Sequence, residues 1–284
     1  MEFLSPQAEA RYAEVVARSR GAVVGLDFDG TLAPIVDDPT RAHIHPDAPA
    51  ALAELAREVA AIAVVTGRPA RQVLALGGLE EVGTALGEAG TELYVFGQYG
   101  NERWTSSRRR IVGPRPPAGL ATFERDLPRT LRTHGAADAF VEDKGLAVAV
   151  HTRRMDDPEA AFERLLAPVS SLAEQHGLSV EPGRNVIEIR AGGMHKGQVV
   201  HRLAEELDAR AFVFLGDDLG DLKAFDALAD LRERDVATLG VCSASEEENA
   251  LLERADVVVP GPDGVVGFLG RLARDARDTR DARP

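Results

Sequence analysis

The sequence has little of several features that mark particular classes of protein. It contains a single cysteine, Cys242, so no disulfide framework can form within the chain, which fits a reducing compartment. No apolar run approaches the roughly 20 residues that a membrane-spanning helix needs. The N-terminal stretch MEFLSPQAEARYAEVVARSR is charged and lacks the apolar core of a secretory signal. We therefore expect a cytoplasmic protein that has no membrane partner.

Positive charge is also scarce. The chain carries 33 lysines and arginines against 46 aspartates and glutamates, which gives a formal net charge of -13. Such a surface repels the phosphates of nucleic acids, so we expect no nucleic-acid partner. A small phosphorylated molecule is not excluded, because its binding needs only a local positive field. The sequence gives no indication of the oligomeric state.

Short apolar runs alternate with helical patterns along most of the chain. Four runs have no polar alternation, as is typical of parallel strands that are covered on both faces: AVVGLDF (22–28), AIAVVTGR (61–68), ELYVFGQYG (92–100) and AFVFLGDD (211–218). Helical patterns such as PDAPAALAELARE and HKGQVVHRLAEEL separate them. This alternation predicts an α/β fold, a doubly wound parallel sheet of the Rossmann-like type.

The pattern changes after a Pro/Gly-rich break at 111–119. The strands LAVAVHT and NVIEIR alternate apolar and polar residues, which indicates a sheet with one open face, and helical patterns lie at about 119–133 and 158–176. We predict that residues 105–190 form a smaller α+β cap domain inserted into a core made of residues 1–104 and 191–284. The C-terminal segment RLARDARDTRDARP has no clear apolar stripe, so we expect it to fray.

Polar side chains cluster where the core strands end. Asp27 and Asp29 follow the first strand, the turn Thr66-Gly67-Arg68 follows the second, and Asp217 and Asp218 end a later strand, with Asp221 just beyond. In open α/β sheets the ligand crevice lies outside these carboxyl ends, at the switch in strand order. The sequence therefore predicts that the acidic groups converge in one crevice.

Carboxylates that lie so close together repel each other unless a cation neutralises them. A hard divalent ion with oxygen ligands suits this set, and Mg²⁺ with retained waters and phosphate oxygens suits it best. Lys196 begins the helix before the second acidic group, where its ammonium can reach the same phosphate. Each short motif is weak evidence alone, whereas their order on the expected elements strongly favours a functional site.

This order of motifs, DFDGT, TGR, HKG and GDD, resembles that of the haloacid-dehalogenase-like phosphatase superfamily. The resemblance implies that Asp27 is a nucleophile that forms an aspartyl-phosphate, and that Asp29 is the general acid and later the base. It implies that Thr66 and Lys196 bind phosphoryl oxygens. It also implies a Mg²⁺ site built from Asp27, the Asp29 carbonyl and Asp217, with Asp218 or Asp221 acting through water or orienting the site.

The segments VEDKGLAVAVHTRR, VEPGRNVIEIRAGGMHKG, DFDGTLAPI and GQYGNERW resemble those of trehalose-6-phosphate phosphatases. This resemblance implies a cap that contacts the sugar hydroxyls through Glu142, Lys144 and Arg153. Asn101 and Glu102 are candidates where the core meets the cap, and Gly67 and Arg68 are further candidates for substrate contact.

The chain departs from that family at two points. It reads GDDLGDL, with Gly220 and Leu222 where the family commonly has threonine and glutamate, and Tyr99 replaces a common histidine or smaller residue. Two alternatives therefore stay open beside a Mg²⁺-dependent trehalose-6-phosphate phosphatase. The same chemistry could act on another disaccharide phosphate or a pseudo-disaccharide (cyclitol) phosphate, or the chain could be a non-catalytic sugar-phosphate sensor.

Overall fold

The computed structural model describes residues 1–36, 38–183, 185–244 and 251–282. The chain divides into two compact units: the larger contains Met1–Gly113 and His195–Pro284, and the smaller contains Pro114–Met194. The expected cap began at residue 105, but Thr105 ends a strand of the larger unit and Val112 forms a bridge with Arg103. The segment up to Gly113 therefore lies with the larger unit.

Eight strands of the described residues form the sheet of the larger unit, in the order β1-β12-β11-β10-β2-β3-β4-β5. Neighbours from β12 to β4 are parallel, and β1 and β5 pair antiparallel at the two edges. Their bounds are β1 Glu2–Phe3, β2 Ala22–Leu26, β3 Ala61–Val65, β4 Glu92–Gly97, β5 Glu102–Thr105, β10 Ala211–Gly216, β11 Ala237–Ala244 and β12 Val257–Pro260.

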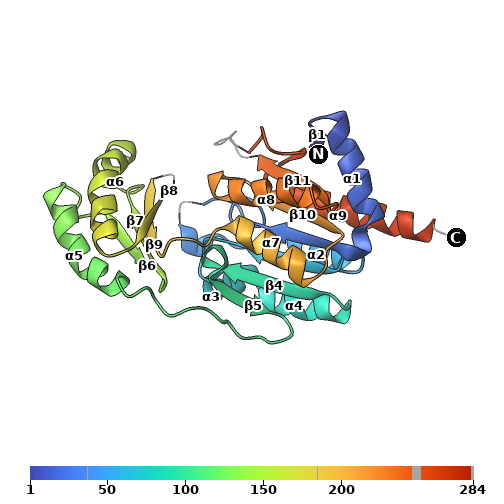
Figure 1. Cartoon of the computed structure of the whole chain (residues 1–284), viewed down its shortest axis with the longest axis horizontal. Coiled ribbons are helices and arrows are strands. Elements are labelled where there is room, and N and C mark those ends of the chain that lie inside the picture. Colours follow the sequence, from blue (N-terminus) through green and yellow to red (C-terminus); the bar gives the residue numbers. More distant parts are fainter. Residues whose placement is uncertain (37, 184, 245–250, 283–284) are drawn as a thin grey trace. The chain divides into compact units, whose positions relative to one another are not determined.

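Helices cover both faces of this sheet, and alternate residues of each strand pack against different helices. In β2, Val24 and Leu26 pack with one set of helices, whereas Val23 packs with the other. The first set is α1 (Pro6–Ala17), α2 (Ala48–Ala56), α3 (Ala70–Gly77), α4 (Leu79–Glu88) and α9 (Gly261–Asp281). The second set is α7 (Lys196–Glu206) and α8 (Leu222–Arg232). The predicted doubly wound α/β fold is confirmed (Figure 1).

The strand order places the crevice of this sheet. From β2 the chain proceeds to β3 and β4 on one side, and it later returns to β10 on the other side of β2. The switch in strand order therefore lies between β2 and β10. Ligands bind outside the carboxyl ends of the strands at such a point, and these two strands lead directly into Asp27 and Asp217.

Local sequence explains several helices, although not every one was expected. Ser5 caps α1 by accepting a 3.1 Å hydrogen bond from the Ala8 amide, and Pro6 fills the first turn.

The helix α4 and the strand β5 were not expected. The glycines Gly83 and Gly87 weaken the helical pattern of α4, but Gly83 allows close contact with the Trp104 ring.

The expectation that the C-terminal segment frays is wrong, because α9 continues to Asp281. Leu272, Ala273 and Ala276 are buried and supply a narrow apolar stripe made mostly of alanines. Arg280 adds two hydrogen bonds of 2.9 and 2.7 Å to the carboxylate of Glu58, which is buried.

The smaller unit is an antiparallel sheet with two helices on one face (Figure 1). Its strands run in the order β6-β7-β9-β8, with bounds β6 Phe140–Asp143, β7 Ala147–His151, β8 Ser179–Gly183 and β9 Val186–Arg190. The helices are α5 (Leu120–Thr133) and α6 (Pro158–Gln175). Val148, Val150, Ile187 and Ile189 pack against them, so the alternate side chains form the opposite, polar face.

Candidate active site

Two carboxylates lie at the centre of the crevice, one from each strand of the switch point. Asp27 follows β2 and Asp217 follows β10, and both residues are buried. Gly30 makes their approach possible: a Cβ atom there would lie 1.9 Å from an oxygen of Asp217. Its φ of 68° is also in the left-handed region that glycine adopts without strain. The DFDGT turn therefore folds directly against the later acidic motif.

Lys196 joins the two acidic motifs. Its ammonium lies 2.8 Å from Oδ1 of Asp27 and 2.7 Å from Oδ1 of Asp221, and the side chain is 3% exposed. Gly197 next to it is required by packing, since a Cβ atom there would lie 2.2 Å from the Lys223 carbonyl oxygen. The start of α7 is thus pressed against the start of α8, which holds the ammonium between both carboxylates.

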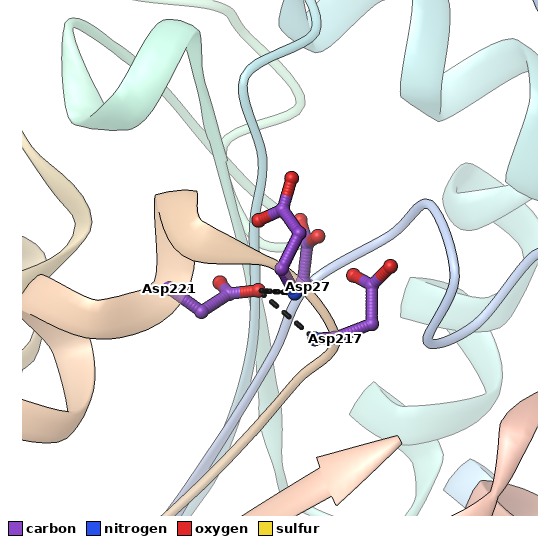
Figure 2. Close-up of side chains that lie close together, drawn as sticks. Asp27, Asp217 and Asp221 are labelled. Carbon is purple, nitrogen blue, oxygen red and sulfur yellow. Dashed lines mark hydrogen bonds between the residues drawn. The ribbon is translucent and has the colours of Figure 1, made fainter. Parts of the chain in front are cut away.

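Asp221 shapes the turn that carries the other two aspartates. Its Oδ2 accepts hydrogen bonds from the backbone amides of Asp217 (3.1 Å) and Asp218 (3.4 Å), drawn as dashed lines in Figure 2. The Asp218 carboxylate in turn accepts from the Gly220 amide at 2.9 Å, which completes a reciprocal cap of the turn η4 (Leu219–Asp221). Because both oxygens of Asp221 already have partners, its main task is to orient the turn.

The acidic cluster, which we define as Asp27, Asp217, Asp218 and Asp221, can hold a cation. One oxygen of each lies within 4.8 Å of the others, and Lys196 contributes one positive charge. Burial and repulsion by Asp27 raise the pKa of Asp217 to about 10, and burial raises the pKa of Asp27 well above its usual value although Lys196 opposes this. Burial raises the pKa of Asp221 to about 6 against the effect of Lys196.

Repulsion among the carboxylates adds to burial in raising these pKa values, as expected where one positive charge faces four acidic groups. Burial disfavours the Lys196 ammonium, but Asp221 and Asp27 raise its pKa well above the usual value, so it remains charged. One ammonium still leaves the four carboxylates undercompensated. The remaining donors are carboxylate oxygens, which suit a hard divalent ion, so the residues present fit the expected Mg²⁺.

Asp29 lies beside this cluster and has its own cation. Arg68 donates a bidentate pair of hydrogen bonds to the Asp29 carboxylate, with Nε 2.6 Å from Oδ2 and Nη2 2.6 Å from Oδ1. The Asp29 side chain is 36% exposed, whereas that of Arg68 is 13% exposed. The two aspartates of the DFDGT motif therefore have different environments, since Asp27 is buried against Lys196 and Asp29 is partly solvated against Arg68.

The TGR turn is fixed to the neighbouring strand end. Thr66 is buried, and its hydroxyl accepts a 3.1 Å hydrogen bond from the Arg68 amide. Gln98 and Tyr99 donate backbone hydrogen bonds of 2.9 Å to the carbonyls of Arg68 and Thr66. Gly67 packs against the Tyr99 ring, since a Cβ atom at Gly67 would lie 2.9 Å from the Tyr99 side chain. The tyrosine that departs from the family pattern thus covers this turn.

Asn101 and Glu102 have local partners at the same edge of the sheet. The Asn101 side-chain amide donates to the Gln98 carbonyl at 3.0 Å. The Glu102 carboxylate accepts from the Ala70 amide at 2.6 Å, which caps the N-terminus of α3. These contacts give both residues a structural task, and their expected substrate contact stays a prediction.

The remaining candidates lie in the smaller unit. The strand register places Glu142, Ala149, Glu188 and Glu181 in one row across its polar face. Lys144 lies 2.5 Å from Glu188, and His151 lies 2.9 Å from Glu142. Arg190 reaches Glu181 at 3.0 Å and completes the polar face, which we define as Glu142, Lys144, His151, Glu181, Glu188 and Arg190.

Sequence reasoning found part of this face and missed the rest. Glu142 and Lys144 were expected, whereas Glu188 and Arg190 were not singled out, although the alternation in NVIEIR places both on the polar face. Arg153 is exposed in the turn after β7 and does not enter the hydrogen-bonded pairs of this face among the described residues. The structure therefore brings two of the three expected sugar contacts together.

A doubly wound core with an inserted α+β unit is also the fold of a solved haloacid dehalogenase-like hydrolase from Bacteroides thetaiotaomicron, which superposes with a TM-score of 0.59 at 16% identity over 88% of this chain and 99% of that one. The C-terminal domain of the Candida albicans trehalose-6-phosphate phosphatase superposes with a TM-score of 0.76 at 18% identity, over 96% of this chain and 98% of that one. At this identity the comparison establishes the fold alone.

The family model for trehalose-phosphatase matches residues 25–257, so the chain belongs to the trehalose-phosphatase family. A trehalose-phosphate phosphatase of Mycolicibacterium paratuberculosis is 33% identical over 219 residues, which are 74% of this chain and 52% of that protein. A Mycobacterium tuberculosis protein described as an uncharacterized glycosyl hydrolase is 34% identical over 220 residues, 74% of this chain and 15% of its own length. The chain thus spans about half of one relative and a small part of the other.

Proposed function

We propose that this chain is a phosphoric monoester hydrolase that converts trehalose 6-phosphate to trehalose and phosphate. The family membership supports the reaction class and the sugar. The observation that carries the chemistry is the burial of Asp27 against Lys196, beside an acidic cluster that is short of positive charge. An aspartate so placed can accept a phosphoryl group while a cation balances its charge.

The proposed reaction has two steps. A carboxylate oxygen of Asp27 attacks phosphorus, the bond from phosphorus to the sugar oxygen breaks, and Asp29 gives its proton to the departing sugar oxygen. Water then attacks the aspartyl-phosphate, Asp29 removes a proton from that water, and phosphate leaves with Asp27 restored. Thr66 and Lys196 bind the phosphoryl oxygens during both steps, which places positive charge where negative charge develops.

We propose Mg²⁺ as the metal, held by Asp27, the Asp29 carbonyl and Asp217. Asp218 lies at the edge of this set, and Asp221 orients it through the amides of the turn. The ion would neutralise the charge of the phosphoryl oxygens and of the cluster. Removal of divalent ions by a chelator is therefore expected to stop phosphate release, and added Mg²⁺ is expected to restore it.

The smaller unit supplies the contacts that choose the sugar in this proposal. Glu142 and Lys144 lie on the polar face and offer an acceptor and a donor to sugar hydroxyls, and Arg153 is a third candidate. A site that hydrogen-bonds hydroxyl groups discriminates strongly, because a missing hydroxyl leaves a polar group unpaired. A sugar phosphate is the proposed partner. The described residues contain no helix long and apolar enough to cross a membrane, and the cytoplasmic location stays a prediction.

A substrate panel tests the proposal. Phosphate release is measured with trehalose 6-phosphate, other disaccharide phosphates, a cyclitol-containing analogue and glucose 6-phosphate, with and without Mg²⁺. Strong preference for trehalose 6-phosphate supports the proposed sugar, and equal turnover of glucose 6-phosphate contradicts it. Preference for another disaccharide would retain the chemistry and change the substrate. Binding without any phosphate release would support the sensor alternative, against which stand the retained Asp27 and Asp29.

A further inference from the structure

The bidentate pair of Arg68 and Asp29 assigns a different task to the arginine of the TGR turn. We propose that Arg68 is a positioning residue for the acid–base step: it orients the Asp29 carboxylate and does not bind the phosphoryl group. This inference rests on the proposed function, because it concerns how Asp29 reaches the leaving oxygen. It departs from the expectation that Arg68 contacts substrate.

The geometry commits the guanidinium to Asp29. Two of its nitrogens lie 2.6 Å from the two Asp29 oxygens, and Nη1 donates a 2.8 Å hydrogen bond to the Pro39 carbonyl. A planar guanidinium that donates from three nitrogens, one of them to a backbone carbonyl, has a single orientation. That orientation faces Asp29 and the chain at Pro39, whereas the ammonium of Lys196 is the cation that contacts Asp27.

The backbone of Arg68 is held just as firmly. Its amide donates to the Thr66 hydroxyl, and its carbonyl accepts from the Gln98 amide. Gln98 and Tyr99 have φ values of 49° and 60°, so two consecutive non-glycine residues adopt the left-handed conformation at this turn. Such a conformation is unfavourable and persists where the surroundings require it, often at functional sites. The strained turn thus anchors the TGR loop, and the loop anchors Arg68.

Asp29 benefits from such a support because the hydrogen bonds to its carboxylate among the described residues come from Arg68, and because its side chain is partly solvated. It is 36% exposed, in contrast to the buried Asp27, and a solvated carboxylate samples several rotamers. Acid–base catalysis requires the carboxylate within hydrogen-bond distance of the leaving oxygen. During the reaction one Asp29 oxygen exchanges Arg68 for the sugar oxygen, and the second hydrogen bond keeps the carboxylate in place.

The test compares Arg68→Met with wild type on two substrates and on phosphate inhibition. The sugar alcohol of trehalose 6-phosphate is a poor leaving group that needs the proton from Asp29, whereas the phenolate of p-nitrophenyl phosphate departs without it. We expect kcat for trehalose 6-phosphate to fall roughly 10- to 100-fold. Because Asp29 also serves the later water step, the comparison uses the first step with p-nitrophenyl phosphate, which rapid mixing measures as the burst of nitrophenolate. We expect the rate of this first step to change less than about threefold, and the inhibition constant of inorganic phosphate to stay within the same limit, because the phosphoryl ligands are intact.

Equal losses in the first step of both substrates, with weaker inhibition by phosphate, would show that Arg68 binds the phosphoryl group and would overturn the proposal. An unchanged kcat of Arg68→Met on trehalose 6-phosphate would also overturn it. Arg68→Lys keeps the positive charge but cannot form the bidentate pair, so it should give an intermediate kcat with unchanged phosphate inhibition. This variant provides the test if Arg68→Met does not fold. If the wild-type protein releases no phosphate from trehalose 6-phosphate, the proposed function is wrong whatever Arg68 does. The Arg68 variants are then compared on the sugar phosphate that the substrate panel identifies.

Arg103→Met is the matched control. Arg103 makes a bidentate pair with Glu206, with nitrogen–oxygen distances of 3.1 and 2.8 Å, in the same unit but outside the acidic cluster. It should change thermal stability by no more than Arg68→Met does, and it should leave the ratio of the two substrate rates unchanged. A change in that ratio for Arg103→Met would mean that the loss of any such pair perturbs the site.

Discussion

The acidic cluster of the larger unit and the polar face of the smaller unit are both made of carboxylates and cations, but in different proportions. The cluster places four carboxylates around Lys196, and three of them, Asp27, Asp217 and Asp221, are buried. On the polar face Lys144 pairs with Glu188, Arg190 pairs with Glu181, and Glu142 has His151. A set in which each carboxylate has a hydrogen-bonding partner of its own can bind neutral hydroxyls, whereas an undercompensated set has to bind protons or a cation.

The two regions should therefore respond differently to loss of a carboxylate. In the proposed mechanism each carboxylate of the cluster has a separate chemical or electrostatic task, so its loss should affect the rate of reaction. On the polar face each carboxylate is proposed as one of several hydrogen-bond partners for the sugar, so its loss should affect the affinity.

The largest effect is expected for Asp29→Asn. The amide cannot give its proton to the sugar oxygen or take one from water, so kcat for trehalose 6-phosphate should fall roughly 10²- to 10⁴-fold. Steady-state phosphate release measures this effect. Since Asp27 remains, the first step with p-nitrophenyl phosphate should be largely retained, which rapid-quench kinetics can resolve. Loss of that first step as well would mean that Asp29 is needed before the leaving group departs.

The next effect concerns the substrate affinity that the polar face provides. Glu142→Gln and Lys144→Met should each raise KM for trehalose 6-phosphate about tenfold or more, as expected when a hydrogen bond with a charged partner is lost, while kcat for p-nitrophenyl phosphate stays the same. Arg153→Met tests the third candidate. Arg164→Met is the control, because Arg164 bonds the His134 carbonyl in the same unit. A variant that lowers kcat on both substrates would contradict a role confined to the sugar.

The next effect concerns the acidic cluster and the pH dependence of the protein's stability. Without metal, the pKa of Asp217 is about 10 in the folded protein, well above the value of about 4 for an aspartate in an unfolded chain. The folded state therefore binds this proton more tightly. Its stabilising contribution is complete below the unfolded pKa of about 4 and is lost as the pH rises toward 10.

In chelator, the melting temperature of the wild-type protein should fall between pH 6 and 9, and that of Asp217→Asn should fall less. Mg²⁺ replaces the proton as the positive charge, so the rise in melting temperature on adding Mg²⁺ should be larger at pH 8.5 than at pH 6. Scanning calorimetry or dye-based melting measures both. A Mg²⁺ effect that is independent of pH, or larger at pH 6, would contradict the undercompensated cluster.

The smallest effect is expected at Cys242, which is buried in β11 next to the cluster. Burial, with repulsion by Asp217 and Asp221, raises the pKa of the thiol to about 11. Alkylation by iodoacetamide at pH 8 should therefore be slow in the folded protein and fast in guanidinium, and Cys242→Ala should keep its activity. Fast labelling of the native protein, followed by mass spectrometry, would show that this end of the sheet opens.

The sequence allowed the cluster to be predicted better than its surroundings. Asp27 and Asp217 were predicted from apolar runs that end in acidic motifs, because parallel strands end at the same edge of a sheet. Lys196 was predicted from its place at the start of the helix that precedes the second acidic motif. The pair of Arg68 and Asp29 could not be predicted, since it depends on how the TGR turn lies against the DFDGT turn. The capping of α3 by Glu102 was missed for the same reason.

The secondary structure shows a similar division. The central strands are continuous apolar runs and the helices of the smaller unit have clear periodicity, and the structure has both within a few residues of the expected ranges. The helix α4 was missed because Gly83 and Gly87 dilute its pattern. The extension of α9 depends on buried alanines and on the pairing of Arg280 with Glu58, a residue far away in the sequence. Such contacts are decided by tertiary packing and are not visible in a local pattern.

Trapping of the phosphorylated protein most directly tests whether Asp27 takes the phosphoryl group. Trehalose 6-phosphate and Mg²⁺ are mixed with the protein, the reaction is quenched in acid within one turnover, and borohydride then reduces any acyl phosphate to the alcohol. Peptide mass spectrometry should find homoserine at position 27 in the wild-type protein and none in Asp27→Asn. Homoserine at another aspartate, or phosphate release at full rate by Asp27→Asn, would contradict the account.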